Sequence, residues 1–245
     1  MEVTKFLGVF LDKSLTWRTH IDKVITKISQ TVGIIARARS FMNTPQLALL
    51  YNTMVLPHLQ YCLINWGNFK DDHNLSYRNR ILTLQKRFLR IVTNSHPLSH
   101  ADPLFATLKT LKIDDLFEQA VRVFSYQLSQ NELPPRITTL FNKVTHTHQT
   151  RGAQLNLYSN RADHRSIKST ALRHWNPLPK ALKQMPSISS FKTNSKKNLL
   201  LPYSNFTCSA HHCRSCSVAT IQPTKNTDPR SPDQTTRPPD LNVAM

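Results

Sequence analysis

Five branched apolar residues recur near the start of the chain at spacings of four, three, four and three positions: Ile21, Ile25, Ile28, Val32 and Ile35. This spacing places them along one side of an α-helix, in the kind of stripe that packs between neighbouring helices. A helix of this kind gains most of its stability from packing, so the chain must supply other apolar helices to cover the stripe. The pattern therefore predicts a helical bundle.

Two further helical patterns can supply those partners. The first covers residues 45–66, where Thr44 is the expected N-cap, Pro45 occupies the first turn and Pro57 predicts a kink. The second covers residues 75–94 and contains no carboxylate to pair with its cations. We interpret these cations as contacts for phosphate groups, with simple solubility as the alternative. They are Arg78, Arg80, Lys86, Arg87 and Arg90.

The segment that precedes the first helix has the pattern of a β-strand. Residues 3–11 alternate in character and include one charged side chain, Lys5. This composition predicts a single strand that is covered on most of both faces and needs partner strands. Gly8 lies in the middle of the strand, where a glycine marks either a bulge or the close approach of another backbone or of a ligand.

The chain is strongly basic, with a net charge of +18. Because a field of this sign attracts polyanions, nucleic acid is the first candidate partner, ahead of a ribosomal-type or membrane-surface role. Apolar residues make up 39% of the chain, which is enough for a core over roughly the first 200 residues. The sequence has neither an apolar run of about 18 residues nor a signal-peptide pattern. We therefore expect an intracellular protein that is not secreted and has no membrane partner.

The second half predicts a connecting helical segment and a small mixed module. A short helix begins at Asp102, and Asp115 with Glu118 forms a capping-box-like pair that opens a longer helix ending before Pro134. Trp175 is interpreted as a core residue of the module rather than a platform for stacking bases. The remaining predicted elements are a strand at 154–158, an extended or mixed segment at 166–174 and a helix at 187–200.

The last part of the chain has a different composition, rich in Pro, Thr, Ser, Asn and Asp, which predicts a disordered tail over 203–245. Thiolates and imidazoles near its start have the chemistry of zinc ligands. Their spacing is irregular and the surrounding chain is expected to be unfolded, so no metal site is predicted. The weak candidate ligands are Cys208, His212, Cys213 and Cys216.

Several short motifs resemble one protein family. Phe6-Leu7-Gly8-Val9, Leu15-Thr16-Trp17 and His20-Ile21 are similar to the segment that follows the palm in reverse transcriptases of non-LTR (LINE-type) retrotransposons, particularly the jockey clade. The resemblance implies that Phe6, Leu7 and Gly8 belong to the primer grip, where the end of the growing primer strand passes.

Further motifs follow in the family's order as far as about residue 200. Residues 84–92, LQKRFLRIV, resemble the family's LQKRALRII signature, which implies that the preceding helices form the thumb that clamps template and primer. Other matching motifs are Leu50-Tyr51, Pro57, Tyr61-Cys62, Trp66-Gly67, Thr150-Arg151, Ser166-Ile167, Trp175-Asn176-Pro177-Leu178-Pro179 and Ser189-Ser190-Phe191-Lys192.

The expected fold class is mainly α, with a short N-terminal β segment, a thumb-like helical bundle, a small mixed α+β module and a disordered tail. The chain is expected to be a fragment of a larger protein, because the N-terminal strand lacks partners. The predicted domains are the end of the palm at 1–13, the thumb-like bundle at 14–96, a helical connector at 97–135, the mixed module at 136–202 and the tail at 203–245.

The resemblance implies a non-catalytic, C-terminal part of an RNA-directed DNA polymerase that grips an RNA or DNA primer–template and partners the palm and fingers of the same polyprotein. Phe69-Lys70-Asp71-Asp72 resembles the turn that carries catalytic aspartates, but it lies between two helical patterns and predicts a solvated loop. No cofactor is expected in this chain; magnesium is expected for the complete polymerase. The predicted nucleic-acid-binding residues are Phe6, Leu7, Gly8, Lys23, Lys27, Arg78, Lys86, Arg87 and Arg90.

A different class of protein also fits the composition. The alternative is a stand-alone basic helical protein that binds RNA or a protein partner, including one domesticated from such an element. Charge and family resemblance together place the expected location in the nucleus or in a cytoplasmic ribonucleoprotein.

Overall fold

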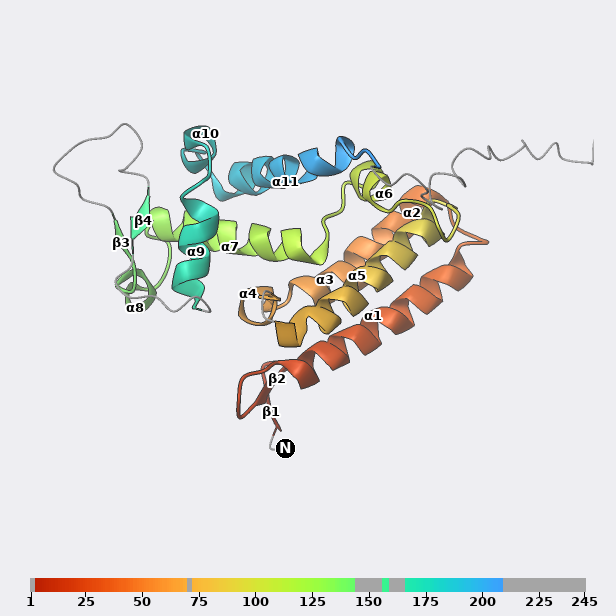
Figure 1. The fold of residues 1–245 in the computed structure, drawn as a ribbon, viewed down its shortest axis with the longest axis horizontal. Coiled ribbons are helices and arrows are strands. Elements are labelled where there is room, and N and C mark those ends of the chain that lie inside the picture. The colour runs from red at the N-terminus through yellow and green to blue at the C-terminus, as the bar shows by residue number, and fades with distance from the viewer. Residues whose placement is uncertain (1–2, 70–71, 144–155, 159–165, 209–245) are drawn as a thin grey trace, which may run out of the picture.

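The computed structural model describes residues 3–69, 72–143, 156–158 and 166–208. These residues are mainly helical, with two small antiparallel sheets. Figure 1 shows a group of long N-terminal helices, coloured red to gold, beside a second group coloured green to blue. The predicted fold class is thus confirmed for a mainly α chain with a short N-terminal β segment and a mixed C-terminal module, whereas the predicted tail lies almost entirely outside the described residues.

The N-terminal segment is a hairpin and not the single strand that was predicted. Strands β1 (Val3–Phe6) and β2 (Val9–Asp12) pair antiparallel, with Phe6 opposite Val9. Leu7 and Gly8 form the turn with positive φ values of 46° and 85°, the conformation that two-residue hairpin turns require. The predicted burial of both faces is also wrong, because Val9 is the only fully buried residue of the two strands.

Helix α1 (Arg18–Ala38) confirms the predicted apolar stripe. All five of its branched residues are buried, and the helix packs against α5 (Asp72–Val92), as Figure 1 shows. The two helices run in the same direction, since Asp22 meets Arg80 near one end and Arg39 meets Asn94 near the other. Helix α1 of this pair also packs against strand β2 of the hairpin.

The predicted helix over 45–66 is divided into four pieces. Its N-cap is Asn43, one residue before the expected Thr44, and the Asn43 side chain forms a capping box with Gln46. A π-helical turn precedes Pro57 and accommodates its ring, and the chain breaks later, at Cys62, where φ is 52°. The pieces are α2 (Thr44–Leu50), the π-helix η1 (Tyr51–Val55), α3 (Leu56–Gln60) and α4 (Leu63–Trp66).

The C-terminal group is built around one long helix. Helix α7 (Ile113–Ser129) packs against α9 (Ile167–Trp175) and α11 (Ile188–Ser204), with the rings of Tyr126 and Phe191 stacked 4.6 Å apart. Its other elements are α6 (Asp102–Thr107), α8 (Pro135–Thr138), β3 (Asn142–Lys143), β4 (Leu157–Tyr158) and α10 (Lys180–Lys183).

Two local predictions in this half are wrong and one is confirmed. The segment 166–174 is helical, because the Ser166 hydroxyl accepts from the backbone N–H of Ser169 and caps α9. Asp115 and Glu118 do not open α7, which begins earlier with Lys112 as N-cap, and both instead bind side chains of other helices. Trp175 is fully buried in the core, as predicted.

The predicted domain boundaries stay predictions. The contacts of α7 with α4 and α5 on one side, and with α9 and α11 on the other, join the predicted bundle, connector and module through a single helix. Phe69, placed in a predicted solvated loop, is buried against Trp66, because it closes the end of the N-terminal core.

Candidate nucleic-acid interface

The tip of the hairpin is the most exposed apolar part of the predicted site. Phe6 and Leu7 are 62% and 75% exposed. The Tyr61 hydroxyl, just beyond α3, donates a hydrogen bond to the Leu7 carbonyl and ties the turn to the helices. The backbone conformation of Gly8 would strain any residue with a Cβ. The turn is therefore held in place although its side chains lie in solvent.

A second set of hydrogen bonds fixes the hairpin to the start of α1. The Asp12 carboxylate accepts from the backbone N–H and the hydroxyl of Thr16, both at 2.8 Å. Burial alone would raise the pKa of Asp12, but these hydrogen bonds outweigh it and the pKa is lowered. Asp12 thus stays ionised and sets the angle between the hairpin and the helix.

This arrangement brings together four of the predicted binding residues. Leu7 and Gly8 from the turn, and Lys23 and Lys27 from α1, line one cavity of about 210 Å³. Phe6 precedes the turn directly. The two lysines stand one helical turn apart and are both exposed, and no carboxylate is among the described residues that line the cavity. Like charges at this spacing repel one another, so the cavity is suited to an anion.

Two histidines complete the cavity. His20, from α1, is only 4% exposed, and neither ring nitrogen has a hydrogen-bond partner; its ring lies edge-on to Trp66. His58 reaches the cavity from α3. Burial lowers the pKa of both histidines and the charge of Lys27 lowers it further. Sequence reasoning missed His58 and Tyr61 as site residues, and His20 was noticed only within a motif.

The cations of α5 are in a different environment from the one predicted. Arg78 forms a two-pronged ion pair with Asp114 of α7, both contacts at 2.6 Å, and this pairing raises the pKa of Arg78. Arg80 pairs with Asp22 of α1 at 2.8 Å. Arg90 donates two hydrogen bonds to the Ser99 carbonyl. Three of the five cations therefore have partners within the protein, supplied by elements outside their own helix.

Lys86 and Arg87 are the α5 cations without such partners among the described residues. They do not join the lysine cavity. Asp22 of α1 binds Arg80 of α5, whereas Lys23 and Lys27 line the cavity with the hairpin and α3. The predicted binding residues consequently fall into two separate groups.

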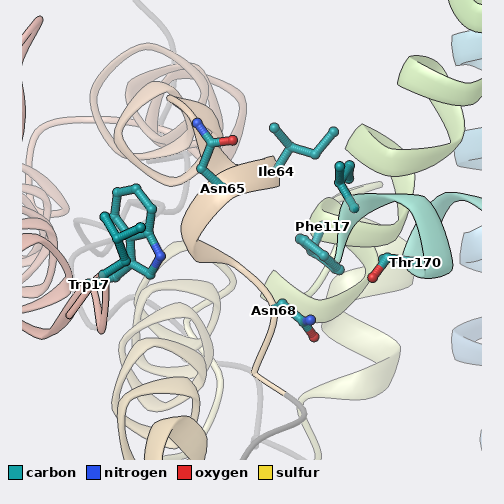
Figure 2. A pocket seen from close by; sticks show the side chains of 8 residues that line it. Trp17, Ile64, Asn65, Asn68, Phe117 and Thr170 are labelled. Atoms are coloured by element: carbon teal, nitrogen blue, oxygen red, sulfur yellow. The ribbon is translucent and has the colours of Figure 1, made fainter. Parts of the chain in front are cut away.

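A larger cavity of about 350 Å³ lies between the two helical groups. Figure 2 shows Trp17 on one side of it and Phe117 with Thr170 on the other, with Asn65 and Asn68 between them. The Asn68 side-chain oxygen is buried without a hydrogen-bond partner. No charged side chain is among the described residues that line it, so this cavity is unsuited to a phosphate group.

The weak zinc candidates cannot be assessed as a set. Cys208 is half-buried, and His212, Cys213 and Cys216 lie outside the described residues. Within the part of the chain that the structure describes, no group of three or more His, Cys, Asp or Glu residues could hold a metal ion. In the same part, no helix is both long and apolar enough to cross a membrane.

Comparison with known proteins identifies a class. The chain contains a region related to the RNA-directed DNA polymerases of jockey-type non-LTR retrotransposons. The relative is the RNA-directed DNA polymerase from mobile element jockey of Drosophila funebris, which is 28% identical over 131 residues. That match covers 52% of this chain but only 14% of the relative. No family model matches the chain. No solved structure matches it either.

Proposed function

We propose that this chain is the nucleic-acid-gripping part of a jockey-type RNA-directed DNA polymerase, with the hairpin as primer grip and the α1–α5 bundle as thumb. The similarity to the jockey polymerase supports the class. The observation that carries the proposal is that the hairpin turn lines one cavity with Lys23 and Lys27, and that none of the described residues lining this cavity is a carboxylate. A primer–template of RNA or DNA is the partner that this charge favours.

Each part of this surface has a distinct role in the proposal. The lysines neutralise backbone phosphates, which gives affinity without sequence preference. The turn offers a rigid apolar edge, because Tyr61 holds the Leu7 carbonyl in place. Lys86 and Arg87 on α5, which do not line this cavity, form a second and weaker phosphate contact.

The rest of the polymerase is the second proposed partner. Phe6, Leu7 and Leu15 are large, exposed apolar residues at the hairpin end of the molecule, where an apolar surface of another domain would cover them. The catalytic aspartates and their magnesium ions belong, in this proposal, to that palm domain. A nuclear or ribonucleoprotein location follows from the same proposal.

The proposal is tested by the salt dependence of binding to an RNA–DNA hybrid duplex, measured by fluorescence anisotropy from about 50 to about 200 mM salt. We expect the double variant Lys23→Gln, Lys27→Gln to bind about tenfold more weakly. Its plot of log affinity against log salt should be shallower by about two.

The matched control removes two other exposed lysines, with Lys192→Gln and Lys197→Gln on α11. It has the same net charge as the test variant but leaves the hairpin surface intact. Equal losses in the two variants would refute the proposed interface and indicate a response to total charge. A Lys86→Gln, Arg87→Gln variant should show a smaller loss than the cavity variant.

A further inference from the structure

We propose that the cavity between the hairpin, α1 and α3 is a phosphate-binding pocket in which His58 acts together with Lys23 and Lys27, so that binding strengthens as the pH falls. Where the phosphate belongs to a nucleic-acid strand, this inference rests on the proposed function. The same chemistry would also accept a free phosphate ion.

The donors of the pocket define its ligand. Lys23 and Lys27 supply two fixed positive charges, and His58 supplies an imidazole, while the His20 ring lines the cavity with both of its nitrogens buried. His58 is the informative residue, because it is half-buried and lines the same cavity as both lysines, so that its ring is the one that a bound anion can meet. The lysines would repel a metal ion. The volume of about 210 Å³ accommodates a tetrahedral oxyanion with a few waters.

The surrounding charges give the pH dependence its direction. Facing the histidines are Lys23 and Lys27 from α1 and Tyr61 beyond α3, while the hairpin contributes Leu7, Gly8 and Phe10, with Lys5 lying over the Phe10 ring. All of the charges in this set are positive. These positive charges disfavour the protonated, cationic form of a histidine in the pocket. A bound anion would offset them and favour the protonated form.

Proton binding and anion binding are therefore coupled. Burial and the charge of Lys27 keep the pKa of His20 and of His58 below its ordinary value in the free protein. A bound oxyanion offsets Lys27 and accepts a hydrogen bond from the ring, which raises the pKa. Because binding then takes up protons, affinity must increase as the pH falls, by thermodynamic reciprocity.

Inorganic sulfate is the first probe, because it stays a dianion across the pH range of histidine titration. Binding is followed by NMR of the full chain carrying ¹³C-labelled histidine. We expect the His58 titration midpoint to rise when sulfate is added. Sulfate should bind several-fold to about tenfold more tightly near pH 5.5 than near pH 7.5.

The variants separate the pocket from general charge effects. His58→Gln is chosen because His58 is only half-buried, and the variant should keep its fold but lose the pH dependence. Lys23→Gln, Lys27→Gln should lose sulfate binding, whereas Lys192→Gln, Lys197→Gln should retain it. An unchanged His58 midpoint in sulfate, or equal pH dependence in His58→Gln, would overturn the inference.

Hybrid duplexes with and without a terminal phosphate distinguish the sources of the ligand. If the duplex competes with sulfate in a lysine-dependent way, the pocket holds a strand phosphate, and a preference for the phosphorylated end assigns a terminal one. If sulfate binds as expected but duplexes do not bind, the inference of an anion pocket holds for a free anion, and the proposed function fails. If, at constant ionic strength, duplex binding needs the lysines but neither sulfate nor pH affects it, the pocket is refuted and the proposed function stands.

Discussion

The α7–α9–α11 core and the hairpin cavity use charged side chains in opposite ways. In the core, Arg122 of α7 is buried and donates to Glu118 at 2.5 Å and to Asn198 at 3.1 Å. In the cavity, Lys23 and Lys27 are both lining residues, and no carboxylate is among the described residues that line it. The difference shows that some cations of a basic chain stabilise its fold by internal ion pairs, while others have no internal carboxylate and can bind an external anion.

Acidic residues account for the difference between the two regions. Glu118 binds both Arg122 and His174, while Lys112 pairs with Asp102 at 2.9 Å, all within the C-terminal helices. Two acidic groups of β2 and α1 are already engaged, because Asp12 binds Thr16 and Asp22 binds Arg80. The unpaired charge at the cavity is therefore a result of how the few carboxylates are distributed.

The largest effect should come from Arg122→Ala. The substitution removes the ion pair between Arg122 and Glu118 and leaves the largely buried Glu118 carboxylate without this partner. We therefore expect the free energy of unfolding, measured by urea denaturation, to fall by about 3 kcal/mol. The lysine variant of the cavity should unfold within about 0.5 kcal/mol of the wild type, since it removes a repulsion. An Arg122→Ala protein as stable as the wild type would contradict the assignment of these charges to structure.

Gly67→Ala tests the packing of the end of α4 against α7. A Cβ at this position would lie 2.5 Å from Leu63 Cδ1 and 2.9 Å from Phe117 Cδ2 of α7, so overpacking should destabilise the protein by about 2 kcal/mol. Gly33→Ala is the matched control, because a Cβ there meets no atom within 4 Å and the change favours helix by up to about 1 kcal/mol. Equal melting temperatures for the two variants would refute this packing.

The smallest expected effect concerns acid stability. The hydrogen bond with His174, aided by Arg122, lowers the pKa of Glu118 below its ordinary value of 4.5, although burial opposes the shift. A lowered folded-state pKa stabilises the protein above that ordinary value, and the contribution is lost as the pH falls through the folded-state pKa. We expect Glu118→Gln to flatten the fall in melting temperature below about pH 4.5, by an amount equivalent to less than about 1 kcal/mol.

This acid effect belongs to a different pH range from the one inferred for the cavity. The control is His58→Gln, which should leave the acid limb unchanged. Parallel melting curves for the wild type and Glu118→Gln below about pH 4.5 would show that Glu118 does not contribute in this way.

Helical periodicity could be predicted from the sequence because it is a local property. The stripe of α1 and the apolar face of α5 each repeat over several turns, so both helices were correctly expected. The hairpin was missed because a leucine at positive φ is uncommon and Leu7-Gly8 lacks the Asn-Gly or Asp-Gly pair that usually marks such a turn. Helix α9 was missed because its nine residues give too short a periodic signal.

The candidate site was predicted in part. Lys23 and Lys27 were named from their position off the α1 stripe, and the turn from its motif. His58 and Tyr61 could not be placed beside them, because α3 and the hairpin meet only in the folded chain: Tyr61 and Leu7 are 54 residues apart in sequence. The pairing of Arg78 with Asp114, 36 residues away, was hidden for the same reason.

The sequence by itself determined the basic charge, the long helices and the motifs shared with jockey-type polymerases, since all of these depend on residue identity and short spacing. Only the tertiary structure decided which cations remain unpaired. Arg80 and Lys23 look equivalent in the sequence, yet Arg80 pairs with Asp22, whereas Lys23 lines a cavity together with Lys27 and the hairpin. The physical reason is that ion pairing depends on distances of a few ångströms between residues that folding brings together from distant parts of the chain.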